Sequence, residues 1–400
     1  MNKKILLIIV LILFIPCIVN ALDFPNTNSK MVEIYDLNDN KLIYEKKSNK
    51  QTSVASLTKI VTSITAIENI KDLDKKVTIT NDMMKTVSWE ASKAGLKTGD
   101  VVTYRDLLYA SMLPSGADAT NSMAIASTGS IDKFVSKMNA LAKKLKLKNT
   151  HFVNVTGLDI KGHYSSADDM RIILEYALNN ETFKKIYTTR NYTLSNGLKV
   201  KSTVSKYVNE VNTSKILGAK TGFTDAAGYC LSSLSNINSH EFIIIVLNAK
   251  VENGKHYNLV DTVNLINFLN KNFKNEYLVK KNDLIKTLPV KLSKIDKYEI
   301  RATKDVIKYL PSDYNKDDFK IKYTGLKELS FKNKKGKEIG TIKYYYENKL
   351  IDKEKVILNK DIKVSFKKLL KKYFYIPLIL IVIILFLITR KKKRKNIKKR

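Results

Sequence analysis

Apolar residues recur at intervals of three and four through several segments of the first two thirds of the chain. In the clearest segment these apolar positions are Leu57, Ile60, Val61, Ile64, Ile67 and Ile70. This spacing places apolar side chains on one face, as in an amphipathic helix packed on a core. Similar spacing predicts helices over residues 56–70, 105–113, 117–127, 131–145, 167–178 and 256–272.

Strand patterns lie at both ends of this helical region. Residues 31–35 and 41–45 alternate between apolar and polar side chains around Asn38-Asp39-Asn40, which predicts a hairpin. Apolar strands are predicted again at 216–221, 227–235 and 241–248. Strands from both ends with helices between them indicate one antiparallel sheet flanked by helices, an α+β fold.

The pattern changes at about residue 277, where short β-prone runs replace the helical spacing. They cover 285–292, 298–303, 320–323, 329–332 and 339–346, and we expect one pair to be joined through Lys335-Gly336. These runs contain no constellation of catalytic side chains. We therefore predict a first domain over 22–274 and a small all-β domain over 275–365.

The two ends of the chain have the composition of targeting segments. Lys3 and Lys4 precede an apolar run, and Val19-Asn20-Ala21 offers small residues at a cleavage spacing, so residues 1–21 are predicted to be a signal peptide. Residues 373–389 are uncharged and rise about 25 Å as a helix, which predicts a short transmembrane anchor. An amphipathic helix on the membrane surface is the alternative.

Charge gives an orientation and narrows the partners. Residues 390–400 are nearly all Lys and Arg, so this tail is expected on the cytoplasmic side and residues 22–372 on the outer face of the cell membrane, with one membrane pass. The net charge of the whole chain is +33. This excess suits anionic cell-wall polymers or lipid head groups, or it reflects a lysine-rich coding bias. Nucleic acid is not expected to be a partner, because an exported chain does not meet it routinely and no binding motif is present.

The first chemical signal is Ser56-Leu57-Thr58-Lys59, at the start of a predicted helix. Positions i and i+3 share a helix face, so an uncharged Lys59 amine can take the proton of Ser56. A serine needs such a base to become an effective nucleophile. Unpaired backbone N–H groups at the helix N-terminus would also favour negative charge there.

Two further motifs make this signal specific. Ser115-Gly116-Ala117 and Lys220-Thr221-Gly222 follow in order, and with Ser-x-x-Lys they form the signature of penicillin-binding proteins and class A β-lactamases. From about residue 31 to 273 the chain resembles the D-alanyl-D-alanine carboxypeptidases, the low-molecular-mass penicillin-binding proteins. The longer matching stretches are 54–62, 113–119, 149–154 with Gly157-Leu158, 166–170 and 220–230.

The resemblance implies a serine β-lactamase-like fold, a penicillin-binding catalytic domain and a cofactor-free reaction. Ser56 would attack the peptide carbonyl, Lys59 would act as general base and Ser115 would relay the proton. The oxyanion would be bound by the backbone N–H groups of Ser56 and Phe223. The terminal carboxylate of a D-Ala-D-Ala stem peptide would be bound by the third motif, Lys220, Thr221 and Gly222.

Two details of this site depend on neighbouring side chains. A second ammonium, that of Lys220, is expected to help keep Lys59 neutral by like-charge repulsion. Ala117 stands where the family's second motif commonly ends in Asn, so one amide hydrogen bond is expected to be missing. Asp118 and Asn121 are the side chains that could replace it.

Several other functions share parts of this evidence. A membrane-anchored serine β-lactamase would carry the same motifs, and a catalytically weak peptidoglycan-binding protein would keep the fold. β-Lactam antibiotics are expected to acylate Ser56 in either enzyme. A metal-dependent carboxypeptidase would need clustered ligands, and no metal site is predicted from the four histidines, His151, His163, His240 and His256.

Overall fold

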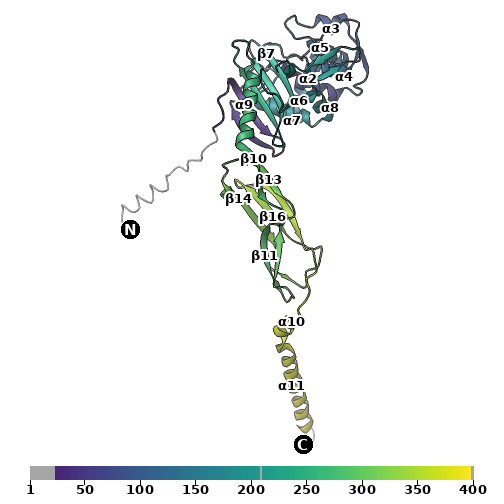
Figure 1. Ribbon diagram of the computed structural model, residues 1–400. Coiled ribbons are helices and arrows are strands. Elements are labelled where there is room, and N and C mark those ends of the chain that lie inside the picture. Colours follow the sequence, from purple (N-terminus) through teal and green to yellow (C-terminus); the bar gives the residue numbers. More distant parts are fainter. Residues whose placement is uncertain (1–22, 208–209, 398–400) are drawn as a thin grey trace, which may run out of the picture. The chain divides into compact units, whose positions relative to one another are not determined.

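The computed structural model describes residues 23–207 and 210–397, and these form two compact units that divide between Lys274 and Asn275 (Figure 1). The predicted signal peptide, residues 1–21, lies outside the described residues.

The first unit is built on a five-stranded sheet with the order β2-β1-β9-β8-β7. Every pair in it is antiparallel, as the sequence predicts. The strand bounds are β1 Ser29–Asp36, β2 Lys41–Lys46, β7 Ile216–Thr224, β8 Gly228–Ile237 and β9 His240–Ala249. Among the described strands, β7 therefore lies at an edge of the sheet, with a strand partner on one side only.

The predicted helices of this unit are confirmed. They are α2 Thr58–Asn69, α4 Tyr104–Met112, α5 Ala117–Thr128, α6 Ile131–Lys144, α7 Ala167–Leu178 and α9 Tyr257–Asn272. α9 packs on β8 and β9, while α7 packs on β9 and β1 (Figure 1). The short helices α3 Asn81–Lys85 and α8 Glu181–Thr188 were not predicted, nor were the small ladders β3–β4 (Lys76–Thr78, Val101–Thr103) and β5–β6 (Asn191–Thr193, Lys199–Lys201).

Helix α2 is the centre of the first core. Its apolar stripe is almost completely buried, with Ile60 at 0% exposure and Val61 and Ile64 at 1%. α4, α5, α6, α7 and α8 all pack against it. Burial on all sides fixes α2, and with it the Ser56 segment, as a rigid platform.

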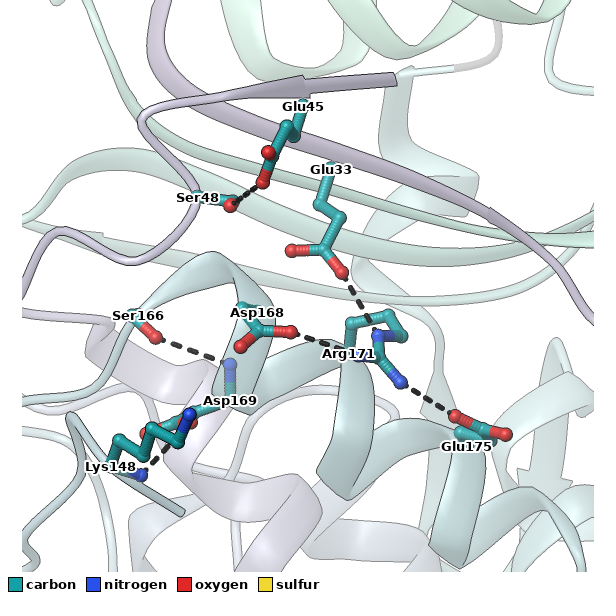
Figure 2. A network of polar contacts seen from close by, with 9 residues as sticks. All are labelled: Glu33, Glu45, Ser48, Lys148, Ser166, Asp168, Asp169, Arg171 and Glu175. Atoms are coloured by element: carbon teal, nitrogen blue, oxygen red, sulfur yellow. Dashed lines mark hydrogen bonds and ion pairs between the residues drawn. The ribbon is translucent and has the colours of Figure 1, made fainter. Parts of the chain in front are cut away.

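A buried charge network joins α7 to the sheet (Figure 2). The guanidinium of Arg171 on α7 donates to Glu33 of β1 at 2.9 Å, and to Asp168 and Glu175 at 2.8 Å each. Its cation also lies 4.5 Å from the ring centre of Tyr35. Glu33 is 1% exposed, and burial raises the pKa of its carboxyl group to about 7. Arg171 therefore ties this helix to β1 through an otherwise costly buried acid.

The second unit is an all-β domain, as predicted. Its strands form three small sheets, β10-β13, β12-β11-β15 and β14-β16-β17, around their own apolar core. The bounds are β10 Phe273–Val279, β11 Leu284–Lys291, β12 Lys297–Arg301, β13 Val306–Pro311, β14 Phe319–Gly325, β15 Leu329–Ser330, β16 Glu338–Tyr346 and β17 Lys349–Ile357.

The expected strand pair through Lys335-Gly336 is wrong. β15, which precedes this dipeptide, pairs in parallel with β11, whereas β16, which follows it, pairs with β14 and β17. Leu329 of β15 is 1% exposed, so burial of this side chain beside Val290 decides the pairing rather than the turn residues.

The C-terminal segment forms two helices, α10 Phe366–Tyr373 and α11 Tyr375–Ile397. Among the described residues, no single helix combines the length and the hydropathy that a membrane span requires. α10 and residues Tyr375–Lys391 meet the requirement only as a pair, with a bend of 44° between them.

Candidate active site

The candidate nucleophile Ser56 lies in a short 3₁₀ turn, η1 Ala55–Leu57, that runs directly into α2. Ala55 has a φ of 47°, a left-handed conformation that is uncommon for a residue with a side chain. Two glycines let other backbone segments approach this turn. A Cβ on Gly157 would lie 1.8 Å from the Ala55 carbonyl oxygen, and one on Gly222 would lie 3.1 Å from the Ser56 nitrogen. The turn is therefore clamped between residue 157 and strand β7.

Lys59 lies one turn further along and reaches back to Ser56. Its Nζ is 3.0 Å from the Ser56 hydroxyl oxygen and 2.8 Å from the carbonyl oxygen of Thr156. The side chain is 2% exposed, and burial lowers its pKa to about 7 against the opposing charge of Asp118. Burial is the main cause of the lowered pKa of Lys59, and the expected repulsion between Lys59 and Lys220 lowers the pKa of Lys220.

The Thr156 carbonyl is a site group that the side-chain motifs do not reveal. Asn154 positions it, since the Asn154 side-chain oxygen accepts hydrogen bonds from the N–H groups of Thr156 and Gly157 at 3.0 and 2.6 Å. Asn154 and Gly157, three residues apart, form a pattern typical of turns, and this pattern is the sequence signal from which the loop could have been predicted.

Ser115 and Lys220 form a second hydroxyl–amine pair. The Lys220 Nζ lies 2.9 Å from the Ser115 hydroxyl oxygen and 2.8 Å from the carbonyl oxygen of Thr221. Lys220 is 0% exposed; burial lowers its pKa well below the ordinary value, and the charge of Lys59 lowers it further. Ser115 has a left-handed φ of 65°, a second strained residue at this site.

The burial of Lys220 changes one expected role. The Lys220 side chain has no exposed surface and does not line the cleft, so a substrate carboxylate cannot contact it in this conformation. The Thr221 hydroxyl, in contrast, lines the cleft and lies 2.7 Å from the hydroxyl of Thr203. The contact of Lys220 with the lining of the cleft is its hydrogen bond to the Ser115 hydroxyl.

The two side chains expected to replace the missing amide at position 117 both bond the 86–96 segment, and only the side-chain oxygen of Asn121 has no hydrogen-bond partner among the described residues. Asp118 accepts backbone hydrogen bonds from residues 94, 95 and 96, at 2.8 to 3.0 Å. Asn121 donates to both oxygens of Thr86 at 3.0 Å. Both side chains fix the 86–96 segment, and Ala117 itself is 1% exposed.

His163 is a buried residue that forms a hydrogen bond with Thr58, two residues after the nucleophile. Its Nδ1 accepts from the N–H of Val153 at 3.2 Å, so its proton is on Nε2, which donates to the Thr58 hydroxyl at 2.8 Å. Burial lowers the pKa of the ring to about 4. His163 is thus neutral and holds the Thr58 hydroxyl and the Val153 backbone in place.

A single set of described residues is close enough together to hold a metal ion: Asp36, Asp39 and His240. It lies at the turn between β1 and β2 and contributes nothing to the cleft lining. One Asp36 oxygen accepts the N–H groups of Asn38 and Asp39, the usual role of a turn-capping carboxylate.

Two hollows of about 480 and 460 Å³ meet at Ser56. Ser56, Glu90, Ser92 and Phe223 line both of them. The first hollow continues along residues 156–160 and 224–225, and the second along Ser115, Thr221 and His256. Phe223, at the junction, is 46% exposed. The candidate nucleophile therefore lies in the middle of an open cleft with room for a peptide on each side.

Comparison with known proteins agrees with this geometry. The profile of D-alanyl-D-alanine carboxypeptidases matches residues 19–251, more than half of the chain, and that of the penicillin-binding protein 5 C-terminal domain matches residues 273–364. The D-alanyl-D-alanine carboxypeptidase DacF of Bacillus subtilis (strain 168) is 29% identical over 347 residues, which cover 84% of this chain and 86% of the relative.

Solved structures extend the likeness over both units. Penicillin-binding protein 5 from Haemophilus influenzae has 25% sequence identity and a TM-score of 0.62, covering 86% of this chain and 100% of its own. The Streptomyces K15 DD-transpeptidase has 29% identity and a TM-score of 0.55, covering 62% and 98%. The chain therefore belongs to the D-alanyl-D-alanine carboxypeptidase family, the serine peptidases of the penicillin-binding protein 5 type.

Proposed function

We propose that Ser56 removes the terminal D-alanine from peptides ending in D-Ala-D-Ala, through an acyl-enzyme. The observation that carries this proposal is the Lys59 amine, buried 3.0 Å from the Ser56 hydroxyl with a pKa lowered to about 7. An ordinary lysine is protonated at neutral pH and cannot accept a proton. Lys59 is neutral in about half of the molecules there, so it can serve as general base.

Acylation would begin with transfer of the Ser56 proton to Lys59. The serine oxygen attacks the carbonyl of the penultimate D-alanine, and the carbonyl oxygen gains negative charge. We place that oxyanion between the backbone N–H groups of Ser56 and Phe223, because Gly222 lets β7 approach the Ser56 backbone. In this step the role of the third motif is structural: Gly222 lets β7 lie close to the Ser56 backbone, and the next residue, Phe223, supplies a backbone N–H group.

Collapse of this intermediate requires a proton for the leaving amine. Ser115 is the candidate relay: its hydroxyl gives a proton to the leaving amine and takes up the proton that Lys59 received from Ser56, so that Lys59 becomes neutral again. The hydrogen bond from the Lys220 amine positions this hydroxyl. The C–N bond breaks, D-alanine leaves and Ser56 keeps the acyl group as an ester. A water molecule then attacks this ester with Lys59 as base, which releases the shortened peptide and restores the Ser56 hydroxyl.

The carboxylate of the leaving D-alanine would lie in the second hollow. The hydroxyls of Thr203 and Thr221 line it, together with Lys206 and His256. His256 is held there by Glu210, 3.1 Å from its Nδ1, and by the ring of Tyr207, 3.8 Å away between ring centres. This set supplies hydroxyl donors and positive charge to a terminal carboxylate.

A β-lactam would acylate Ser56 through the same steps. The rate at which the resulting ester is hydrolysed distinguishes a carboxypeptidase from a serine β-lactamase. A carboxypeptidase keeps the penicilloyl ester for a long time, whereas a serine β-lactamase hydrolyses it rapidly. The family match supports the carboxypeptidase.

We also propose that the chain is held at the outer face of the cell membrane by its C-terminal helices. Support comes from the uncharged residues 373–389 and the basic residues 390–400, which favour a cytoplasmic tail. The bent pair of α10 and α11 has the combined length and hydropathy for this role. Protease added to wall-stripped cells should remove the catalytic unit, and its protection would contradict this orientation.

The test of the activity uses the full-length protein in detergent and a peptide ending in D-Ala-D-Ala. Wild type should release D-alanine, and Ser56→Ala should release none. Ser63→Ala is the matched control, because Ser63 lies on α2 with a buried hydroxyl that has no hydrogen-bond partner among the described residues. Undiminished release by Ser56→Ala, or a fluorescent penicillin that still labels it, would overturn the assignment of the nucleophile.

A further inference from the structure

One sheet of the second unit carries a row of three lysines on neighbouring strands. Lys322 of β14 lies directly opposite Lys343 of β16, which in turn lies directly opposite Lys353 of β17. Opposite residues of antiparallel strands point to the same face, and neighbouring strands are about 4.8 Å apart, so the row spans about 10 Å. We call these three residues the lysine row. Lys322 and Lys353 are exposed, and Lys343 is partly buried.

The lysine row lies on the outer face of its sheet. Successive side chains of a strand point to opposite faces, and the two neighbours of Lys343 along the chain, Ile342 and Tyr344, are both 0% exposed in the core of this unit. Lys343 therefore points away from that core. The neighbours of the row on the same face include no acid; they are Lys320, Thr324, Thr341, Tyr345 and Lys355.

The protein does not neutralise the lysine row. Within the described part of the chain, no aspartate or glutamate side chain forms an ion pair with any of its three members. Two carboxylates of the same sheet have other partners, since Glu338 pairs with Lys355 at 3.0 Å and Asp352 pairs with Lys304 at 2.8 Å. Like charges directly opposite each other destabilise a sheet. The row therefore carries a cost in stability that an anion from outside the protein would relieve.

Apolar surface lies beside these charges. Tyr345 is two residues from Lys343 on the same face, and it lies opposite Leu350, which is 50% exposed. A tyrosine ring can pack on hydrocarbon while its O–H donates to an anionic oxygen. Lys320, which lies opposite Tyr345 on the other neighbouring strand, adds a further ammonium. This face therefore suits a chain of anionic groups that are joined by short hydrocarbon links.

The anchor helix is attached to a different sheet of this unit. Ser365, the N-cap of α10, donates its N–H to the carbonyl of Leu292 at 2.9 Å, and Lys368 of α10 pairs with Asp296. Both partners lie in the turn between β11 and β12, strands that do not belong to the sheet of the lysine row. A lipid surface reached through α10 and α11 therefore meets the β11–β12 turn first, which favours a polymer in solution as the ligand of the row.

We infer that the lysine row and Tyr345 bind a flexible phosphodiester polymer of the cell wall. Each ammonium meets one phosphate, and the carbon links of the polymer pack on Tyr345 and Leu350. The long lysine stems adjust to the spacing of the phosphates. This site lies outside the catalytic cleft and adds a binding activity to the proposed function. The inference takes from that section only the outer location of the chain, where wall polymers are within reach.

Lysine acetylation measured on the full-length protein in detergent tests the site one residue at a time. Mass spectrometry gives the rate at each lysine separately, so binding of the probe to the basic tail does not mask the row. The probe is a short poly(glycerol phosphate) at low salt. It should slow acetylation of each row lysine about two- to fivefold, because one exposed ion pair stabilises the unreactive ammonium by about that factor.

Three other lysines serve as internal controls. Lys75, Lys133 and Lys143 are exposed, belong to the first unit and form no ion pair with any described residue. Their acetylation rates should not change when the polymer is added. Equal slowing of these lysines and of the lysine row would overturn the inference, because it would mean that the polymer binds any exposed lysine.

Variants separate the arrangement of the charges from their number. The two triple variants are Lys322→Gln/Lys343→Gln/Lys353→Gln in the row and Lys75→Gln/Lys133→Gln/Lys143→Gln as the control of equal charge. The polymer should no longer slow acetylation of Lys320 in the row variant and should still slow it in the control. Both variants should release D-alanine at the wild-type rate. The row variant should melt no lower than wild type, since it loses a repulsion.

Two results would overturn the inference from these variants. Continued protection of Lys320 in the row variant would mean that the row does not hold the polymer. A lower melting temperature of that variant would mean that the row stabilises the sheet rather than straining it. Phosphatidylglycerol in mixed micelles is the last comparison, and it should leave the row unprotected. Protection by this lipid without protection by the polymer would overturn the choice of ligand. None of these measurements depends on cleavage of D-Ala-D-Ala, so failure of the proposed activity remains a separate result.

Discussion

The Lys59 amine lies closer to the carbonyl oxygen of Thr156, at 2.8 Å, than to the hydroxyl it is to deprotonate, at 3.0 Å. A neutral amine has two N–H bonds and one lone pair. When one N–H is directed at Thr156, the lone pair is free to face the Ser56 proton. A backbone carbonyl thus orients the base in a chain whose second motif lacks the usual amide.

The pKa of Lys59 sets the first prediction. Because the neutral amine is the active form, acylation by penicillin should rise about tenfold per pH unit below pH 7 and level off above it. Stopped-flow acylation rates between pH 5 and 9 measure this profile. A rate independent of pH between 5 and 7 would exclude Lys59 as the titrating base.

Gly157 and Gly162 offer a matched pair for the second prediction. Both have a positive φ, 90° and 89°, but a Cβ on Gly157 would lie 1.8 Å from the Ala55 carbonyl oxygen, while the nearest atom at Gly162 would be 3.8 Å away. Each Gly→Ala change should cost about 1 kcal/mol through backbone strain. Gly157→Ala should in addition displace Thr156 and reduce acylation more than tenfold. Urea unfolding and acylation rates test both, and equal effects of the two variants would contradict the clamp.

Buried Glu33 gives a prediction about stability. Its pKa in the folded protein, about 7, is above the ordinary 4.5, so the folded state binds the proton more tightly than the unfolded state. Stability from this group is therefore present below pH 4.5 and lost as pH rises through 7, by up to about 3 kcal/mol. The difference in unfolding free energy between wild type and Glu33→Gln, measured by urea denaturation from pH 4 to 8, should follow this sign. A difference that stays constant over the range would rule out the titration.

Ala117→Asn should restore a hydrogen bond to the base or the substrate. Among the described residues, the Lys59 amine bonds Ser56 and Thr156 and has no partner on α5, while Asp118 and the Asn121 amide nitrogen bond the 86–96 segment. One such bond is worth about 1.5–3 kcal/mol, or roughly ten- to a hundredfold in acylation rate. Stopped-flow rates decide the matter, with thermal melting to show that the larger side chain is accommodated. An unchanged or slower variant would mean that the Thr156 carbonyl already replaces the amide.

Much of the fold was predictable because its main elements are long and periodic. The stripe from Leu57 to Ile70 predicts α2, and the alternation around residues 38–40 predicts the β1–β2 hairpin. Elements without room for a period were missed, such as α3. β15 has only two residues, and its pairing depends on where Leu329 is buried. The pairing of β15 depends on contacts with residues far away in the sequence, so it cannot be predicted from the local pattern of apolar and polar residues.

The site was predictable where side chains carry the chemistry. Ser56, Lys59, Ser115 and Lys220 all belong to motifs, and the structure brings them together in two hydroxyl–amine pairs. The Thr156 carbonyl was missed because every residue has one, so a main-chain group leaves no mark of its own on the sequence. The complete burial of Lys220 was missed because exposure depends on how the units of the fold pack.

The position of β7 at the edge of the sheet has a further consequence, which concerns aggregation of the protein at high concentration. An open sheet edge attracts strands from neighbouring molecules and is a common origin of aggregation. At Gly222 the η1 turn lies so close that an added Cβ would be 3.0 Å from that of Ala55. The η1 turn packed against β7 therefore narrows the approach to this edge. We expect the contact that shapes the cleft also to hinder pairing of this edge with the sheet of a second copy of the protein.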